Sequence, residues 1–304
     1  MKKVTACRPK TYKTGCNFKL YPYLSWTSCG GMGIEGAYPL KYIRAFIHRY
    51  DIVPTLWNNH KTARLCFVQA QSLYYDTFSS VASHEIIPFV WDCWPHFDNK
   101  LCKWIARHGV KACIFTSKQA ARRIKERIPY LNVLALTEGI NLDLYPAGKR
   151  LIDRETDLYT FGRQPEYVYN THFAPLSFLR GGTDKEFKYR LQNSKVTICV
   201  PRCDVTPEQT GGQETLTQRY WECMLSRVVI VGRAPKELID LTGYNPVIDI
   251  DMNHLDCQIK DIVGHVTDYQ EMIDHNRETA LRMGSWDIRM KQVMEWLRGL
   301  GYDV

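Results

Sequence analysis

The sequence predicts an α/β protein with two domains, each built on a mainly parallel sheet. Short runs rich in β-branched and aromatic residues alternate with amphipathic helical stretches, the pattern of helices layered on parallel strands. The length of 304 residues suits two domains of ordinary size. Residues 141–156 hold a proline, a glycine and several charges, as expected of an interdomain link. We therefore expect one sheet on each side of this link.

The first half of the chain supplies five predicted strands and two predicted helices. The strands are residues 51–57, 63–69, 86–91, 111–117 and 132–137, and the helices are residues 39–50 and 117–128. Ser117 is a natural N-cap for the second helix, because a serine hydroxyl can accept a hydrogen bond from a free N–H group of the first turn. Residues 10–38 are rich in Gly, Tyr, Cys and Ser, and their pattern indicates no regular element.

The second half repeats this rhythm. Its predicted strands are residues 157–162, 195–200, 227–232 and 246–250, and its predicted helices are residues 184–194, 216–225 and 234–243. A helical tail over residues 268–300 follows, and we expect it to break near Gly284. Two Rossmann-like domains that face a cleft are the expected architecture.

Two glutamates eight positions apart, Glu214 and Glu222, lie in the stretch QETLTQRYWECM. They follow a predicted strand that ends at Pro201 and a loop that contains Gly211 and Gly212. In open α/β sheets, ligands bind beyond the carboxyl ends of the strands, where a helix N-terminus offers free N–H groups to a phosphate. Glu214 would lie in the loop at the helix start, and Glu222 about two turns further along. At about 100° per residue, this spacing places both carboxylates on nearly the same helix face, where each can accept from a diol. On spacing alone, two ordinary helix charges are the simpler interpretation.

The order of features around these glutamates resembles that of GT-B glycosyltransferases of the retaining, glycosyltransferase group 1 type. Residues 200–232 fit its Glu-x7-Glu motif, which lies between a strand ending in proline and a valine-rich strand ending in glycine. Residues 137–146 (TEGINLDLYP) are similar to the segment that precedes the family's second domain, and residues 157–163 (DLYTFGR) resemble the first strand of that domain. The Ser-Trp pair in residues 285–297 resembles the helices that return to the family's first domain.

The resemblance implies a function and a division of the chain. Residues 1–145 would bind the acceptor, residues 146–285 would bind the nucleotide-sugar donor, and residues 286–304 would form a helix that packs back on the first domain. The enzyme would move a sugar from a nucleoside-diphosphate sugar to a hydroxyl acceptor, a glycan or a lipid-linked precursor, with retention of configuration. It would need no cofactor and no metal.

The resemblance also implies roles for individual residues. Glu214 would contact the hydroxyls of the donor sugar, Glu222 would contact the ribose, and Arg163 would contact the diphosphate. The remaining nucleotide contacts would come from the loop before the helix and from the helix itself: Gly211, Gly212, Thr215 and Arg219.

Two departures from the family bear on the diphosphate site. The family usually adds a lysine a few residues after the arginine, and GRQPEYVYN has none. Arg219 or Arg180 could substitute, because a guanidinium binds phosphate oxygens bidentately. The stretch from Arg163 to Pro201 is also shorter than in the family, so we expect a trimmed donor domain.

In the first half, the stretch FVWDCWPHFDNK follows a predicted strand and clusters aromatic and acidic side chains: Trp91, Asp92, Trp94, His96 and Asp98. Carboxylates bind sugar hydroxyls and aromatic faces pack on sugar C–H groups, which makes Asp92 the catalytic candidate of this domain. A buried tryptophan cluster in which Asp92 caps a turn is an equally good interpretation. The glycine-rich SCGGMGIEG, with Gly31, resembles a loop that family members place near the donor phosphates, although its spacing matches no phosphate-binding fingerprint.

Two other functions remain open at this point. A metal-dependent GT-A transferase could use Asp249-Ile250-Asp251 as its DxD motif. A non-catalytic protein of the same fold could bind nucleotide sugars, which the missing lysine and the shortened domain would favour.

Charge and cysteine content suggest partners and location. The formal net charge of +8 favours an anionic partner and is compatible with contact with an anionic membrane surface, while the absence of a dense basic block argues against nucleic acid. No apolar run approaches the roughly 20 residues that cross a bilayer, and no secretory signal is visible, so we expect a cytoplasmic protein that could work at the inner face of the membrane. The eleven cysteines include no CxxC pair and are expected to be reduced; a zinc cluster of distant cysteines is the less favoured alternative.

Overall fold

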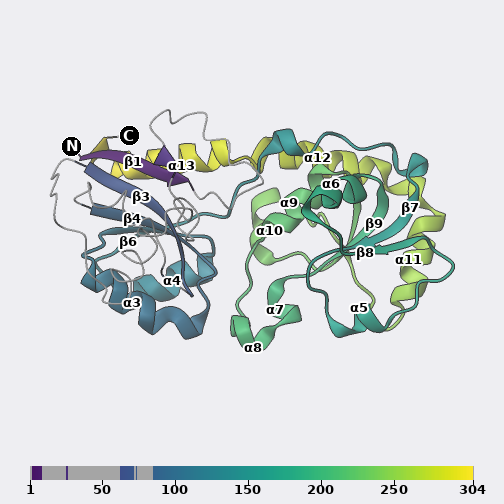
Figure 1. Cartoon of the computed structure of the whole chain (residues 1–304), viewed down its shortest axis with the longest axis horizontal. Helices are drawn as coiled ribbons and strands as arrows, with labels where there is room; N and C mark the ends of the chain where they lie inside the picture. The colour runs from purple at the N-terminus through teal and green to yellow at the C-terminus, as the bar shows by residue number, and fades with distance from the viewer. Residues whose placement is uncertain (1, 9–24, 27–61, 72, 74–84, 304) are drawn as a thin grey trace, which may run out of the picture. The chain divides into compact units, whose positions relative to one another are not determined.

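The computed structural model describes residues 2–8, 25–26, 62–71, 73 and 85–303, which belong to two compact units (Figure 1). The first unit comprises Met1–Glu138 and Trp286–Val304, and the second comprises Gly139–Ser285. The sequence-based boundary after residue 145 lies a few residues later than this division. The difference arises because Ile140 and Tyr145 are buried in the core of the second unit.

The first unit is built on a parallel sheet with strand order β12-β1-β3-β4-β5-β6, and β2 pairs with β1. Its strands are β1 (Lys2–Arg8), β2 (Ser25–Trp26), β3 (Thr62–Gln69), β4 (Glu85–Trp91), β5 (Ala112–Phe115), β6 (Asn132–Ala135) and β12 (Tyr302–Asp303). Its described helices are η1 (Pro95–Phe97), α3 (Asp98–Arg107), α4 (Lys118–Arg127) and α13 (Trp286–Gly299). The predicted helix 39–50 and strand 51–57 lie outside the described residues.

The core of the first unit joins the sheet to the C-terminal helix. The strands β4 (EIIPFVW) and β5 (ACIF) are buried along nearly their whole length, as strands of parallel sheets are. Ser117 caps α4 as predicted, since its hydroxyl accepts a hydrogen bond from the Ala120 N–H at 3.5 Å. On α13, Trp286 and Met290 are buried in this core, and the Trp286 ring meets the Phe89 ring edge-on at a centroid distance of 5.9 Å. The helix that ends the chain therefore completes the first unit.

The second unit contains a parallel sheet with strand order β11-β10-β9-β7-β8. Its strands are β7 (Thr156–Thr160), β8 (Phe178–Arg180), β9 (Ser194–Cys199), β10 (Val229–Gly232) and β11 (Ile248–Asp249). Its helices are η2 (Leu142–Leu144), η3 (Leu151–Asp153), α5 (Glu166–Asn170), α6 (Asp184–Gln192), α7 (Arg202–Val205), α8 (Pro207–Thr210), α9 (Gln218–Leu225), α10 (Lys236–Thr242), α11 (Leu255–Gly264), η4 (Val266–Tyr269) and α12 (Gln270–Met283). The predicted break in the helical tail is confirmed, because α12 ends at Met283 and α13 begins at Trp286.

Helices cover both faces of the second sheet. Successive side chains of a strand point to opposite faces, so Tyr159 of β7 packs in one cluster with α9 and Leu158 packs in another with α11 and α12. The buried Arg154 joins the segments around the sheet, since its guanidinium donates to the carbonyl oxygens of Ser194 at 2.7 Å and Ser226 at 3.1 Å. Burial lowers the pKa of this guanidinium to about 10. The prediction of an α/β protein with two parallel sheets is confirmed.

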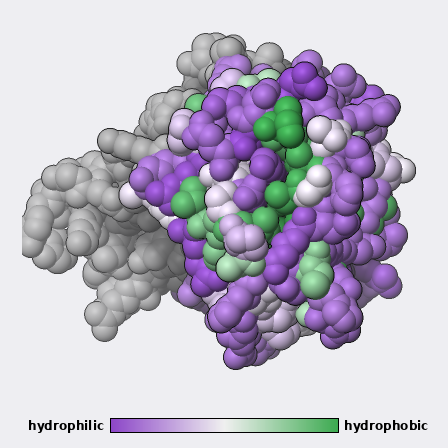
Figure 2. All heavy atoms as spheres, turned by 90° about the vertical axis from the view of Figure 1, so that its right-hand side faces the viewer, coloured by the Kyte–Doolittle hydropathy of each residue, from purple (hydrophilic) through white to green (hydrophobic). Residues whose placement is uncertain are grey.

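Figure 2 shows the end of the second unit that lies at the right of Figure 1. This face is hydrophilic over most of its area, with hydrophobic residues in a strip near its centre and in smaller separate patches. Across the described residues, no helix combines the length and the apolar character needed to cross a bilayer. The cysteines whose side chains are described are free thiols, most of them buried, and no group of three or more metal-ligating side chains occurs among the described residues.

Candidate functional site

The strand order of the second sheet reverses between β7 and β9. From β7 the chain passes to β8 at one edge of the sheet, and it then returns to β9 on the other side of β7 and continues through β10 to β11. The loops that leave the carboxyl ends of β7 and β9 therefore diverge in opposite directions. Ligand sites in open parallel sheets form at such a topological switch point.

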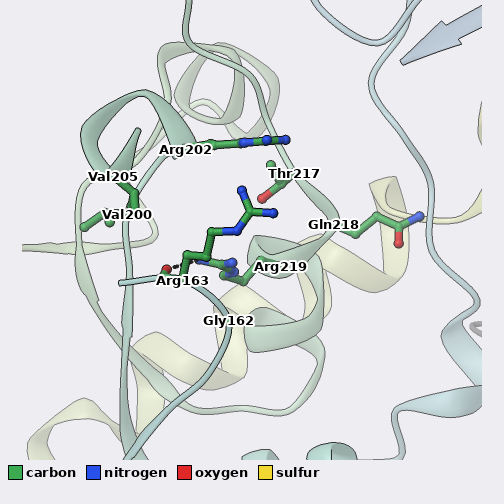
Figure 3. Close-up of a pocket in the computed structure, with 8 residues that line it drawn as sticks. All are labelled: Gly162, Arg163, Val200, Arg202, Val205, Thr217, Gln218 and Arg219. Atoms are coloured by element: carbon green, nitrogen blue, oxygen red, sulfur yellow. Dashed lines mark hydrogen bonds between the residues drawn. The ribbon is translucent and has the colours of Figure 1, made fainter. Parts of the chain in front are cut away.

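A pocket of about 460 Å³ lies at this switch point (Figure 3). Its lining comes from the loop after β7, the segment after β9 and the start of α9. The lining residues are Gly162, Arg163, Val200, Arg202, Val205, Thr217, Gln218 and Arg219. The volume is within the range of small-molecule sites, roughly 300–1,000 Å³.

Three arginines, one from each segment, contribute to this pocket: Arg163, Arg202 and Arg219 (Figure 3). A guanidinium stays protonated at any physiological pH and presents several N–H donors in a planar fork that matches phosphate oxygens. No carboxylate is among the described residues that line the pocket. The pocket is therefore built to attract an anion.

A glycine gives Arg219 the space it occupies. Gly162 has φ +65°, and a Cβ atom added to it would lie 2.4 Å from Nη2 of Arg219. The guanidinium passes over the Phe161 ring at 5.4 Å from the centroid, and its Nη1 donates to the carbonyl oxygen of Arg163 at 3.5 Å. Residue 162 thus favours glycine for two reasons, its left-handed backbone and the close approach of Arg219.

The start of α9 adds backbone donors to the pocket. Thr217 is the N-cap of this helix with extended backbone angles, and its hydroxyl makes no capping hydrogen bond. The first N–H groups of a helix have no partner within the helix, and they carry the positive end of its dipole. Because Thr217 and Gln218 line the pocket, an anion there would lie at this helix start.

Gln164 joins the two strands that flank the switch point. The residue is buried, and its Nε2 donates to the carbonyl oxygens of Phe161 at 2.9 Å and Ile198 at 3.1 Å. One side chain therefore links the end of β7 to the end of β9. This link helps to hold the loop that carries Arg163 against the segment that leads to Arg202.

Comparison with known proteins supports this description of the fold. No family model and no curated protein matches the sequence. Among solved structures, HepE of Anabaena in complex with UDP and glucose matches with a TM-score of 0.60 and 10% identity, over 98% of this chain and 100% of HepE. Sucrose-phosphate synthase of Thermosynechococcus elongatus matches with a TM-score of 0.58 and 10% identity, over 99% of both chains. TarM of S. aureus matches with a TM-score of 0.53 and 9% identity, over 84% of this chain, which spans 58% of TarM.

The chain has the GT-B fold. This confirms the predicted fold class and disfavours the GT-A alternative. The Asp249-Ile250-Asp251 triplet lies where β11 ends and serves the local backbone instead. Asp251 Oδ1 accepts hydrogen bonds from the N–H groups of Asn253 at 3.0 Å and His254 at 3.2 Å, which shapes the turn before α11.

In this GT-B chain, Glu214 lies in the loop before α9, as predicted, so it does not share a helix face with Glu222. The helix α9 begins at Gln218, because Thr217 keeps extended backbone angles. Glu214 forms an ion pair with Arg233, and its Oε2 accepts a hydrogen bond from the Lys236 N–H at 2.6 Å. This carboxylate therefore joins the end of β10 to the start of α10.

Glu222 lies on α9 beside Arg219, in a largely enclosed position. The Tyr145 hydroxyl donates to its Oε1 at 2.8 Å. Burial raises the pKa of the Glu222 carboxyl, against the opposing effects of that hydrogen bond and of the positive charges of Arg219 and Lys188. A carboxyl whose pKa is shifted by burial in this way is a candidate functional group.

The other predicted site residues lie in varied surroundings. Gly211, with φ +60°, and Gly212, with φ +72°, form the left-handed turn that ends α8. The hydroxyl of Thr215 accepts a hydrogen bond from Gln213 Nε2 at 3.5 Å. None of the three is among the residues that line the pocket. Arg180 ends β8 and stacks over the Tyr169 ring at 4.6 Å from its centroid.

The candidates of the first half belong to the first unit. Asp92 follows the carboxyl end of β4 with φ +52°, a conformation that is uncommon for residues other than glycine. Trp94 is buried, and Asp98 pairs with Arg123 at 2.9 Å, so these two members of the aromatic-acidic cluster serve the fold. Gly31 lies outside the described residues.

Sequence reasoning missed Arg202, Thr217 and Gln218 as lining residues. A signal for Arg202 was present, because it directly follows Pro201 at the end of a predicted strand, as Arg163 follows Gly162. This signal would have identified Arg202 as a neighbour of Arg163 only if β7 and β9 were known to be adjacent, and no local sequence pattern reveals that adjacency.

The raised pKa of Glu222 predicts how stability changes with pH. Above the folded-state pKa, the buried charge costs folding free energy; as pH falls below the unfolded value of about 4.3, that cost disappears. We expect Glu222→Gln to raise the Tm of the ligand-free protein at pH 7, with a gain that shrinks toward pH 4. Circular dichroism melts of wild type, Glu222→Gln and the exposed-site control Glu278→Gln test this. An unchanged or lower Tm for Glu222→Gln at pH 7 would contradict the assignment.

Gly162→Ala should displace Arg219 and weaken anion binding. The added Cβ would collide with the guanidinium, and losing one charge-assisted contact costs about 1.5–3 kcal/mol, roughly a tenfold or greater rise in Kd for inorganic pyrophosphate by calorimetry. Gly243→Ala is the matched control, because Gly243 also has positive φ, at +82°, but has nothing within 4 Å of an added Cβ. Equal losses of affinity in the two variants would show that Arg219 does not depend on Gly162.

Proposed function

We propose that this protein transfers a sugar from a nucleoside-diphosphate sugar to a hydroxyl acceptor. The observation that carries the proposal is the convergence of Arg163, Arg202 and Arg219 on one pocket at the switch point of a GT-B fold. Structures of the same fold add support, since HepE of Anabaena was solved with UDP, with UDP and glucose, and with UDP-glucose.

The donor diphosphate would occupy the arginine pocket. Arg163 and Arg219 take the roles that the sequence resemblance implied, and Arg202 takes the place of the missing lysine. When the bond between the sugar C1 and the diphosphate breaks, negative charge grows on the departing group. Fixed guanidinium groups and the N–H groups of α9 stabilise that charge more in the transition state than in the ground state. With the charge balanced in this way, the transfer requires no metal.

Two glutamates would hold the donor on either side of the diphosphate. Glu222, next to Arg219 on α9, would accept from the ribose hydroxyls, because Tyr145 engages its Oε1 and leaves Oε2 for the ligand. Glu214 would accept from the sugar hydroxyls. The turn at Gly211 and Gly212 and the adjacent Thr215 would lie along the nucleotide.

The first unit would bind the acceptor. Asp92, at the carboxyl end of β4, would bind a glycan or lipid-linked hydroxyl. The acceptor oxygen would bond to C1 from the face that the diphosphate leaves, and its proton would pass to the departing diphosphate, so that the anomeric configuration is retained. Exclusion of water would favour transfer over hydrolysis.

Nucleotide binding by arginine variants tests the proposal. We expect UDP or GDP to bind the wild type, and Arg163→Ala and Arg202→Ala each to raise Kd by roughly 10- to 100-fold, since a charge-assisted hydrogen bond contributes about 1.5–3 kcal/mol. Titration calorimetry measures this, with Arg150→Ala as the control at an exposed arginine of the same unit. Melting curves establish that the variants are folded.

The outcomes separate the remaining functions. If no nucleoside diphosphate binds, or if all three variants bind equally well, the proposed donor site is wrong. Nucleotide binding without release of nucleoside diphosphate from any donor sugar would favour a non-catalytic binding protein. Loss of turnover in EDTA would contradict the metal-independent reaction.

A further inference from the structure

The positive charge of the chain is concentrated in one short segment. Residues 98–127 contain nine lysines and arginines but only two acidic residues, so this tenth of the chain carries seven of the eight net positive charges. The rest of the chain is nearly neutral. The sequence-based expectation that the chain has no dense basic block is corrected by this segment.

This segment forms two helices on the same face of the first sheet. The strands β4, β5 and β6 are parallel neighbours, α3 connects β4 to β5, and α4 connects β5 to β6. Because such crossovers are right-handed, both helices cover the same face, and Figure 1 shows them at the same side of the sheet. Asp98 of α3 accepts from the guanidinium of Arg123 of α4 at 2.9 and 3.0 Å, which joins the helices directly.

The basic side chains lie on the outward sides of these helices. Their apolar sides are buried, with Leu101 and Ile105 of α3 and Ile124 of α4 in the core. On each helix, most of the exposed basic residues recur every three or four positions, which places them on one side. The exposed residues, together called the basic face, are Lys100, Lys103, Arg107, Lys111, Lys118, Arg122, Lys125 and Arg127. One of the two acids, Asp98, is buried, so Glu126 is the exposed acid of this segment and pairs with Arg122.

An exposed aromatic residue lies at the end of the basic face. Tyr130, which follows α4, is 62% exposed. The Lys125 ammonium donates to the carbonyl oxygens of Pro129 at 2.7 Å and Leu131 at 2.8 Å, which holds the turn that presents Tyr130. Tyrosine combines an apolar ring with a polar tip, and such side chains are enriched at the interface between lipid and water.

We infer that the basic face binds the surface of an anionic lipid bilayer. Two helices side by side offer a broad basic surface, and five of the eight basic residues are lysines, which act as point charges rather than as forks for a particular phosphate. Clustered basic residues on amphipathic helices are attracted to anionic lipids, and a neighbouring aromatic residue adds an interfacial anchor. This inference does not depend on the proposed function.

Vesicle sedimentation at different salt concentrations tests the inference. The wild type is expected to sediment with vesicles of phosphatidylcholine and phosphatidylglycerol at 50 mM NaCl, to be released as salt increases, and not to bind pure phosphatidylcholine. Lys103→Glu/Lys118→Glu should bind at least tenfold more weakly, and Tyr130→Ser should weaken binding at every salt concentration. Arg150→Glu/Arg282→Glu makes the same change in net charge at exposed sites of the second unit and should retain binding.

Two results would overturn the inference. Equal losses in the two double variants would mean that net charge, not the basic face, determines binding. Tighter binding to duplex DNA than to the anionic vesicles at the same salt concentration would assign the basic face to nucleic acid. Melting curves and circular dichroism show whether each variant is folded.

Discussion

The neighbouring positions of β7 and β9 in the second sheet determine what the rest of the site can be. Both strands end at the same edge, their connections diverge, and an arginine follows each strand after two intervening residues, Arg163 after β7 and Arg202 after β9. Because the carboxyl ends of β7 and β9 are adjacent, the two arginines that follow them lie close together as well. Gln164 bridges the two strand ends through backbone carbonyl oxygens, so the spacing of the charges is set by hydrogen bonds and not by the flexible side chains alone.

The arginine that follows β10 and those that line the pocket have different surroundings. Arg233, after β10, is paired with Asp204 and Glu214, which raises the pKa of its guanidinium. At the pocket, by contrast, the lining contains arginines without a carboxylate. Glu222 lies beside Arg219, and burial raises the pKa of its carboxyl. A bound anion with diol groups would match both the guanidinium groups of the pocket and this carboxylate.

The sequence predicted most of the elements but only part of the site. The apolar runs of β9 and β10 and the Ser117 cap indicate their elements through local chemistry, and these predictions were accurate. The helix α3 was missed. The start of α9 was placed two residues too early, at residue 216 instead of Gln218, because Thr217 keeps extended backbone angles. Arg163 could be predicted because residues 157–163 resemble a strand of a known family, whereas the position of Arg202 depends on strand order, which is a property of the whole sheet.

The position of a bound nucleotide tests whether Arg163, Arg202 and the start of α9 bind a diphosphate. In a crystal structure of the protein with UDP, the account predicts diphosphate oxygens within hydrogen-bond distance of the guanidinium groups of Arg163 and Arg202 and of the first N–H groups of α9. The nucleotide would then lie at the switch point of the second sheet, with its ribose toward Glu222. A UDP molecule that is well ordered elsewhere, with neither arginine in contact with its phosphates, would contradict the account.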